Sequence, residues 1–307
     1  MTDATVAAGQ EAISRGSQSF AASARLFDGP TRQSAVMLYA WCRHCDDVID
    51  GQTLGHDASA IPEEAAAERL AALERSTRAV LAGVPSPDPA FAGLGRVVAR
   101  HAIPARYPLD HLAGFAMDVD GRRYETIEDT LDYCYHVAGV VGVMMAHVMG
   151  VRDPAILDRA CDLGLAFQLT NIARDLVADA EVGRVYAPAT WLAEAGIPEG
   201  ELADERHRGR LAGVAGRIVD AAEPYYASAL CGVAALPRRS AWAIATAHGV
   251  YRQIGIEVRR RGPRAWDQRV STSTAQKLGF VLRGGGLALA GRGAAPTPRD
   301  GLWTRPS

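Results

Sequence analysis

Residues 39–50 read YAWCRHCDDVID, where three aspartates and an arginine stand among side chains that commonly build a protein core. At about 100° per residue, four polar side chains of this stretch share one helical stripe: Tyr39, Arg43, Asp46 and Asp50. Carboxylates one turn apart repel each other by roughly 3 kcal/mol at an effective dielectric constant of about 20, unless a cation lies between them. The spacing therefore predicts a metal-binding helix, against the alternative that Asp-Asp-x-x-Asp is a solvated helix end.

A second stretch repeats this arrangement. Residues 168–179 read QLTNIARDLVAD, and four oxygen-bearing side chains share one helical face: Gln168, Asn171, Asp175 and Asp179. Hard divalent cations prefer oxygen ligands, and Mg²⁺ typically completes its coordination with water and phosphate oxygens. Two such helices predict a Mg²⁺ clamp for a diphosphate, with Mn²⁺ as the alternative ion. The predicted metal ligands are Asp46, Asp50, Asn171, Asp175 and Asp179, and Arg43 and Arg174 are predicted cationic donors to the diphosphate.

The composition is that of a globular chain without a strong electrostatic field. The chain has 307 residues, of which 48% are hydrophobic, and its formal net charge is −2. It can bury a sizeable core, and its charge gives no reason to expect a nucleic-acid partner. The first residues lack the features of a secretory signal, and no run approaches the roughly 20 apolar residues of a membrane span. We therefore expect a cytoplasmic protein.

The C-terminal region carries an excess of positive charge. From residue 259 onward there are ten basic residues and two acidic ones. Residues 286–307 are rich in Gly, Pro and Arg, so we expect a disordered tail after a helical domain that spans residues 1–285. Such a tail could rest on anionic lipid, which makes peripheral contact with the inner face of the membrane an open alternative. No glycine-rich loop here follows a predicted strand, so no NAD(P)H site is expected.

The five cysteines are odd in number and scattered, so disulfides are not expected. Cys42 and Cys45 form a Cys-x-x-Cys pair, which in other proteins is a redox or zinc motif. No second pair and no neighbouring histidine pair completes a tetrahedral site, and the motif lies within the predicted helix. Small core cysteines are therefore the favoured interpretation.

The helix-start signals and the lack of a convincing alternating pattern indicate an all-α protein. Asp28 and Asp153 each precede a proline near the start of a predicted helix. Thr126 and Asp129 have the spacing of a capping box at the start of a helix over residues 126–150. The breaks between the predicted helices are too short to separate domains, so one helical domain is expected.

Small side chains lie on one face of the predicted helix over residues 126–150. They include Ala138 and Gly142, and Gly164 lies one turn before Gln168 on the second acidic helix. Glycine inside a helix costs about 1 kcal/mol, so some compensation is needed. Either tight helix packing or a groove for an apolar chain would supply it.

Five segments resemble a known family, the trans-isoprenyl diphosphate head-to-head synthases, which comprise squalene, dehydrosqualene and phytoene synthases. The segments are GSQSF at 16–20, LYAWCRHCDDVID at 38–50, YCYHVAGVVG at 133–142, QLTNIARD at 168–175 and GRVY at 183–186. The resemblance covers nearly the whole chain. Within the family, the sequence is most similar to bacterial phytoene synthases, through residues 37–55 and through the lack of a C-terminal membrane anchor of the squalene-synthase type.

The resemblance implies a single all-α isoprenoid-synthase domain, like that of class I terpene synthases, with both aspartate-rich helices facing a central cavity. It implies a Mg²⁺-dependent prenyl transferase that joins two geranylgeranyl diphosphates through prephytoene diphosphate. The product would be 15-cis-phytoene, and the reaction would be the first committed step of carotenoid biosynthesis. A squalene synthase would instead quench its last cation with hydride from NADPH. Contact with other carotenoid enzymes is a further expectation.

The resemblance also implies roles for individual residues. It assigns diphosphate contacts to Ser19, Tyr39, Arg43, Gln168, Tyr251 and Arg269. It places Tyr133 at the reacting cation and Phe20 in the pocket wall. One departure is Ala178, which stands where the family often has glutamate but faces away from the acidic stripe. Asp47 lies about 60–100° from its stripe and is expected to support the ligands from outside the site.

Three alternatives stay open. The first is the same chemistry on farnesyl diphosphate, as in dehydrosqualene or squalene synthases, which the length of the cavity would decide. The second is a non-catalytic family member that acts as an assembly protein, which is disfavoured because every acidic stripe position is present. The third is a di-iron carboxylate bundle, which is disfavoured because two Glu-x-x-His motifs are lacking.

Overall fold

The computed structural model of the chain describes residues 23–51, 63–290 and 298–306, together with residues 5, 6, 10, 11 and 13. The predicted substrate-binding residues Ser19 and Phe20 therefore lie outside the described residues. The described part contains helices and no strand, which confirms the predicted all-α class. None of its helices has the length and apolar character that crossing a membrane requires.

The described helices follow one another in a bundle. The α-helices are α3 (Gly29–Asp50), α4 (Glu63–Leu81), α5 (Pro89–His101), α6 (Arg106–Val119), α7 (Ile127–Cys134), α8 (Val140–Val148), α9 (Pro154–Glu181), α10 (Ala189–Glu194), α11 (Arg208–Val233), α12 (Arg238–Arg261) and α13 (Thr274–Ala290). A π-helix, η1 (Tyr135–Gly139), separates α7 from α8. Three short 3₁₀ helices are η2 (Glu199–Glu201), η3 (Glu205–His207) and η4 (Gly262–Arg264).

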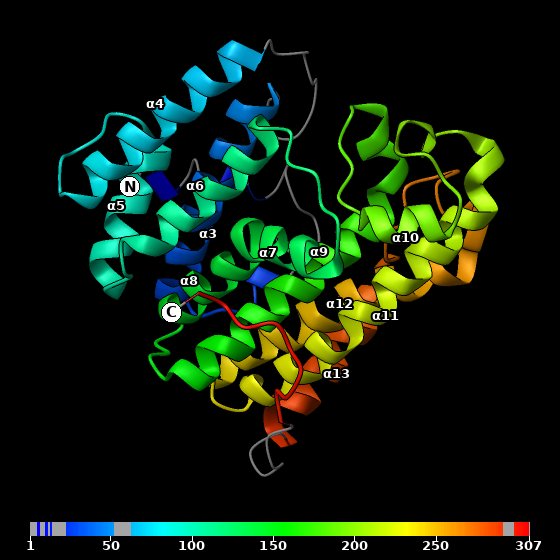
Figure 1. Cartoon of the computed structure of the whole chain (residues 1–307). Helices are drawn as coiled ribbons and strands as arrows, with labels where there is room; N and C mark the ends of the chain where they lie inside the picture. The colour runs from blue at the N-terminus through cyan, green and yellow to red at the C-terminus, as the bar shows by residue number, and fades with distance from the viewer. Residues whose placement is uncertain are drawn as a thin grey trace.

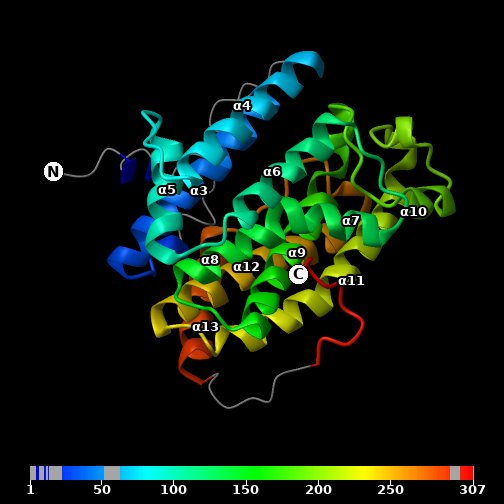
Figure 2. The same ribbon diagram turned by 60° about the vertical axis from the view of Figure 1, so that its left-hand side comes forward.

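Helix α9 occupies the middle of the bundle. In Figures 1 and 2 the blue and cyan helices α3–α6 and the yellow to red helices α11–α13 lie on opposite sides of the green helices α7–α9. Helix α9 packs against α8, η1, α11 and α12. Its buried residues, among them Leu157, Leu163 and Leu169, lie on several faces, as expected of a helix surrounded by neighbours. This central position fixes the second acidic stripe inside the protein.

The predicted helix starts have the expected caps. Asp28 accepts a hydrogen bond from the backbone N–H of Thr31 at 2.9 Å, and Asp153 accepts one from that of Ala155 at 2.9 Å. Thr126 forms a capping box with Asp129. Such caps satisfy backbone donors that have no partner within the helix. Both acidic stretches are thus carried by helices whose starting points are set locally by the sequence.

The helix predicted over residues 126–150 is interrupted by η1. His111 Nδ1 lies 3.1 Å from the backbone oxygen of His136 and donates to it, so a side chain of α6 bonds to the wider turn. His136 Nδ1 in turn lies 2.8 Å from the backbone oxygen of Asp110. A π-helical turn is one extra residue in an otherwise regular helix, so it leaves almost no trace in the hydrophobic pattern. Such turns are frequent at functional sites.

The described C-terminal residues differ from the expected disordered tail. Helix α13 continues to Ala290, beyond the predicted boundary at residue 285. Residues 298–306 lie against the helical bundle, where Arg299 and Arg305 form ion pairs with Asp162 and Asp158 of α9. Composition alone does not reveal that these arginines have carboxylate partners far away in the sequence.

Candidate active site

A cavity of about 1140 Å³ lies inside the bundle and is lined by residues from both acidic helices. Asp46 and Asp50 of α3 and Asp175 and Asp179 of α9 border it. All predicted site residues that the structure describes line this cavity: Tyr39, Arg43, Asp46, Asp50, Tyr133, Ala138, Gly142, Gln168, Asn171, Arg174, Asp175, Asp179, Tyr251 and Arg269. Side chains separated by more than 200 residues in the sequence therefore share one site.

Arginines neutralise most of the acidic residues at this site. Arg43 is paired with Asp46, and Arg184 with Asp50, so each stripe aspartate of α3 has a guanidinium partner. Asp175 accepts hydrogen bonds from its neighbour Arg174, of which the bond from Nε measures 2.8 Å. The carboxylates would otherwise repel one another inside a partly buried site.

The pKa values of the carboxylates at the site are shifted in different directions. Burial, reinforced by the charges of Asp50 and Asp47, raises the pKa of Asp46 to about 6. Burial and the charge of Asp175 raise the pKa of Asp179 to about 7. Burial also acts against ionisation of Asp175, but its hydrogen bonds and ion pairs with arginines hold its pKa below the usual value. A cation bound nearby would favour the ionised form of the carboxylates whose pKa values are raised.

The donor set fits a divalent cation with oxygen ligands. Asn171 Oδ1 is buried without a hydrogen-bond partner, while its Nδ2 donates to Gln168 Oε1 at 3.3 Å. An unpartnered buried amide oxygen normally costs stability, and a bound cation would satisfy it. Within the described part of the chain, no three carboxylate, imidazole or thiol groups are gathered into a ready-made metal site. The carboxylates that would serve are largely occupied by arginines.

Aromatic side chains border the cavity beside the charged residues. Tyr251 of α12 stacks on Phe167 of α9, with ring centroids 4.1 Å apart. Tyr133 stacks on Tyr186 with a centroid distance of 4.5 Å. The quadrupole of such rings attracts cations, so these positions could stabilise positive charge that develops near them.

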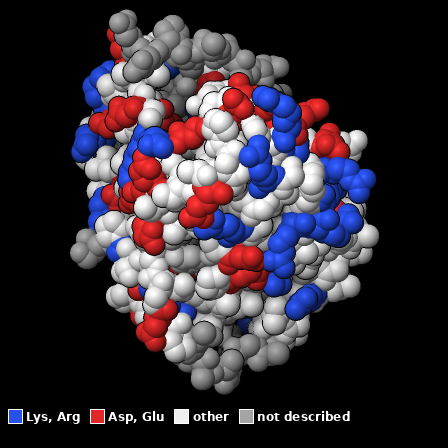
Figure 3. All heavy atoms as spheres, turned by 45° about the vertical axis from the view of Figure 1, so that its right-hand side comes forward, with Lys and Arg blue, Asp and Glu red and all other residues white. Residues whose placement is uncertain are grey.

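Charge on the outer surface is mixed. On the face shown in Figure 3, acidic and basic side chains adjoin one another, and many of the basic ones lie toward the right-hand side. Ion pairs between helices also occur at the surface, such as that of Arg259 with Asp220. The aspartates of α3 and α9 that the sequence singled out line the cavity.

Comparison with known proteins places the chain in a family. The family model for squalene/phytoene synthase matches residues 13–276. The chain belongs to the squalene/phytoene synthase family. The match includes both acidic helices and every described site residue.

Relatives within the squalene/phytoene synthase family extend the similarity to nearly the full length. The chain is 57% identical to a 15-cis-phytoene synthase of Enterobacter agglomerans over 95% of this chain and 99% of that protein. It is 55% identical to a phytoene synthase of Pseudescherichia vulneris over 96% of each. A crystal structure of a dehydrosqualene synthase in complex with ligand superposes with a TM-score of 0.81 at 26% identity, covering 91% of this chain and 95% of that one. This chain is thus a prenyltransferase-type enzyme with the isoprenoid-synthase fold.

Two members of the site had no role in the sequence prediction. Asp118, at the end of α6, accepts a hydrogen bond from Tyr186 at 2.9 Å and one from Tyr133 at 3.2 Å. Arg184 follows α9 and pairs with Asp50. Arg184 and Tyr186 lie in the segment GRVY, which supported the family resemblance without receiving a function, whereas nothing in the pattern around Asp118 set it apart.

Asp47 and Arg269 differ in how they relate to the cavity. Asp47 is not among the lining residues, and its carboxylate lies 3.8 Å from Arg43 Nη1. It touches the site through that arginine. Arg269 lines the cavity and donates to Asp175 at 3.3 Å although its side chain is largely exposed. Its guanidinium therefore lies at the exposed edge of the cavity, within reach of both Asp175 and a ligand in the cavity.

The small residues serve helix packing. A Cβ atom on Gly142 would lie 2.3 Å from the carbonyl oxygen of Ala160, and one on Gly164 would lie 2.3 Å from that of Ala138. Helix α9 therefore approaches α8 at Gly142 and η1 at Gly164. Of the two interpretations of these residues, tight packing accounts for the glycines, and the cavity lies beside the contact. Gly142 also borders the cavity.

The Cys-x-x-Cys cysteines are thiols within the bundle. Cys45 is buried, and burial raises the pKa of the Cys42 thiol to about 12. A metal or redox role needs an accessible thiolate, which this environment disfavours. The structure thus places Cys45 in the core and the partly buried Cys42 in the cavity wall.

Proposed function

We propose that this chain catalyses the head-to-head condensation of two geranylgeranyl diphosphates to 15-cis-phytoene through prephytoene diphosphate. The observation that carries the proposal is the cavity itself, because four aspartates on two helices border the same space as a long apolar wall. The identity of 57% to a 15-cis-phytoene synthase supports the choice of product. The site would lie in one helical domain, and the reaction would start carotenoid biosynthesis.

Divalent metal binding is part of the proposal. The ligands would be Asp46 and Asp50 on α3 and Asn171, Asp175 and Asp179 on α9. Mg²⁺, or Mn²⁺ in its place, would supply positive charge to the departing diphosphate when bound. Asn171 supports this assignment most directly, since its buried oxygen has no other partner.

Two arginines would bind the diphosphate when their aspartate partners bind the metal ion instead. Arg43 and Arg174 are held at the site by Asp46 and Asp175. Their guanidinium groups are suited to phosphate oxygens because they present several donors in a plane. Tyr39, Gln168 and Tyr251 would add polar contacts around the same group. Fixed donors of this kind stabilise the charge that develops as diphosphate leaves.

The apolar part of the cavity would protect the carbocations. Val137, Val141 and Met145 line it beside the two packed helices. Such walls exclude water, which would otherwise capture a carbocation. The faces of Tyr133 and Phe167 would stabilise nearby positive charge by about 0.5–2 kcal/mol. The last cation would lose a proton, so turnover should need no NADPH.

A second candidate is the same chemistry on farnesyl diphosphate. The similarity to a dehydrosqualene synthase structure at a TM-score of 0.81 favours it as the alternative. Separate incubations with farnesyl and geranylgeranyl diphosphate, followed by mass analysis of the hydrocarbons, distinguish the two. The proposal predicts that geranylgeranyl diphosphate gives the higher kcat/KM by about tenfold or more. A preference for farnesyl diphosphate would overturn the main assignment in favour of the second. No hydrocarbon from either would favour a non-catalytic assembly role.

Peripheral contact with a membrane is a further part of the proposal. Leu278, Leu282 and Leu289 of α13 are 61%, 71% and 75% exposed. At about 100° per residue they fall within roughly 40° of one another, with Lys277 and Arg283 on either side of the stripe. An apolar stripe with basic flanks suits the surface of an anionic bilayer, where a hydrocarbon product would have to go. Contact with other carotenoid enzymes is proposed on the pathway alone.

A further inference from the structure

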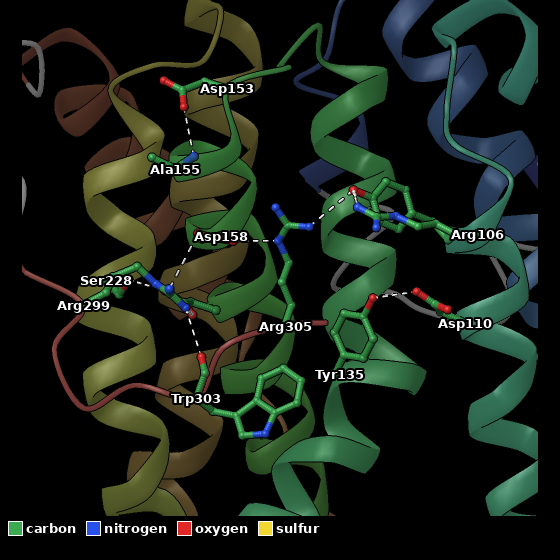
Figure 4. A network of polar contacts seen from close by, with 12 residues as sticks. Arg106, Asp110, Tyr135, Asp153, Ala155, Asp158, Ser228, Arg299, Trp303 and Arg305 are labelled. Carbon is green, nitrogen blue, oxygen red and sulfur yellow. Dashed lines mark hydrogen bonds and ion pairs between the residues drawn. The ribbon is translucent and has the colours of Figure 1, made fainter. Parts of the chain in front are cut away.

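The described C-terminal segment, residues 298–306, is joined to α9 by ion pairs (Figure 4). Arg299 donates from Nε to Asp162 Oδ2 at 2.8 Å and from Nη2 to Asp162 Oδ1 at 2.7 Å. The Asp162 side chain is fully buried. Burying a carboxylate is costly unless it is paired and hydrogen-bonded, so this two-point contact fixes Arg299 on α9.

The contact continues through the protein toward the cavity. Ser228 of α11 donates to Asp162, and Arg159 donates from Nη1 to Ser228 Oγ at 2.6 Å. Arg159 is itself buried and lines the cavity. A series of contacts thus runs from Arg299 of the C-terminal segment, through Asp162 and Ser228, to a side chain in the cavity wall.

Arg159 lies at the end of the cavity that is remote from the acidic residues. It precedes Asp175 by 16 residues in the sequence, which is about 24 Å along a helix at about 1.5 Å per residue. The cavity also includes Ala35 near the start of α3 and Met149 just after α8. Ala35 is at the opposite end of α3 from Asp50. Ala35, Met149 and Arg159 thus line the part of the cavity that is remote from the acidic residues, where the far end of a prenyl chain would lie.

The aliphatic part of Arg159 is fixed against α11. A Cβ atom on Gly232 would lie 2.7 Å from Arg159 Cβ and 3.4 Å from its Cγ. The glycine therefore leaves room for the arginine stem, while the guanidinium is held by Ser228. An arginine whose aliphatic stem is packed and whose guanidinium is hydrogen-bonded has little freedom to move, so its stem can form a fixed part of the cavity wall.

We propose that Arg159 closes the far end of the cavity and thereby limits the length of the prenyl chain, and that Arg299 positions it through Asp162 and Ser228. The inference rests on the proposed function, since it assigns the length limit of the same site. Arg159 is then a specificity-determining residue, and Arg299 is a positioning residue. The terminal isoprene unit of the accepted substrate would meet the Arg159 stem.

The test is a competition between geranylgeranyl diphosphate and the diphosphate that is one isoprene unit longer. Product masses give the ratio of the two kcat/KM values, which does not depend on how much of the enzyme is folded. Arg159→Ala should raise the ratio in favour of the longer substrate by roughly tenfold or more, the scale on which apolar pockets separate chain lengths. An unchanged ratio in a variant that still turns over geranylgeranyl diphosphate overturns the inference.

Arg299 and Arg305 form a matched pair for the positioning role. Arg299→Leu removes the contact to Asp162 and should shift the ratio in the same direction as Arg159→Ala. Arg305 instead bonds to Asp158 at 2.6 Å. Arg305→Leu should therefore loosen the same segment without moving the ratio. An equal shift in both variants, or none in Arg299→Leu, contradicts the role of Arg299.

Two further controls separate misfolding and a wrong function from a wrong inference. If Arg159→Ala does not fold, as judged by circular dichroism, Arg159→Leu replaces it and should shift the ratio in the same direction, and no shift would overturn the length limit. Absence of any hydrocarbon from the unaltered protein with either substrate refutes the proposed function. An active unaltered protein with an unmoved ratio in the variants refutes only the length limit.

Discussion

Arg184 pairs with Asp50, and this contact joins the segment after α9 to the end of α3. The two residues are 134 positions apart in the sequence. A guanidinium thus connects the two acidic helices at the place where the proposed metal would bind. Arginine and metal would neutralise the same carboxylate, so the structure suggests that one can substitute for the other.

Arg184→Ala should make the protein depend on a divalent cation for stability. Without Mg²⁺ the variant should be about 1–3 kcal/mol less stable than the unaltered protein, because Asp50 loses its partner in a partly buried site. Added Mg²⁺ should recover much of this loss, and thermal denaturation with and without Mg²⁺ measures it. Arg217→Ala, which breaks an exposed pair with Glu194, is the control. An equal Mg²⁺ effect on Tm in all three proteins would refute the substitution.

Asp46→Asn and Asp175→Asn should each lower kcat by about 100-fold or more, since each removes charge from the site where diphosphate would leave. The helical fold should persist, because both side chains border the cavity and are not part of the apolar core. Steady-state kinetics at saturating Mg²⁺ and circular dichroism measure the two quantities. Asp220→Asn, on the surface of α11, is the control and should retain activity. Retention of more than about a tenth of kcat in either cavity variant would contradict the metal assignment.

Tyr133 should act through its ring more than through its hydroxyl. The hydroxyl bonds only weakly to Asp118, at 3.2 Å, while the ring stacks on Tyr186 at the cavity wall. Tyr133→Phe should therefore keep kcat within about threefold, whereas Tyr133→Leu should lose about 2–30-fold, the equivalent of roughly 0.5–2 kcal/mol of cation–π stabilisation. Single-turnover rates report the chemical step. A larger loss in the phenylalanine variant than in the leucine variant would assign the role to the hydroxyl.

His147 should destabilise the folded protein in mild acid. Burial, with the charges of Arg152 and Arg305, lowers its pKa to about 4. The unfolded chain has the ordinary histidine pKa near 6.5, so between about pH 6.5 and 4 the unfolded state binds a proton that the folded state does not. The stability associated with neutral His147 is therefore present above about pH 6.5 and is lost as the pH falls.

The difference between His147→Leu and the unaltered protein isolates this group from the carboxylates, which titrate in both. The free energy of unfolding of the variant, relative to the unaltered protein, should rise by up to about 1.4 kcal/mol per pH unit below pH 6.5. Urea denaturation at a series of pH values measures it. A difference that does not vary with pH would mean that His147 is not held neutral by its surroundings.

Leu282→Glu should weaken binding to vesicles that contain anionic lipid. The exposed stripe of α13 would lose apolar area and gain a charge of the wrong sign. Co-sedimentation with vesicles measures the bound fraction, and activity on substrate dispersed in detergent should be unchanged. Val84→Glu, at an exposed position before α5, is the control. Equal binding of both variants would place any membrane contact elsewhere.

The sequence predicted the helical bundle and many of the residues that line its cavity, because both depend on local patterns. A stripe of oxygen ligands at helical spacing is visible in the residues of α3 and α9 alone. The contribution of Asp118 could not be predicted in the same way, since its role comes from tyrosines on other elements. The partners of Arg299 and Arg305 are more than 130 residues away, so composition indicated a solvated tail. Long-range ion pairs and the π-turn at η1 leave no periodic signal.

The central claim is that the two acidic helices and the cavity between them convert geranylgeranyl diphosphate into a hydrocarbon. Its most direct test is mass analysis of the product formed by the purified protein from geranylgeranyl diphosphate and Mg²⁺ without a reductant. The account predicts a product with the mass of phytoene, lost when Mg²⁺ is chelated and lost in Asp175→Asn. Absence of hydrocarbon from the unaltered protein, or equal product from the Asp175→Asn variant, would contradict it.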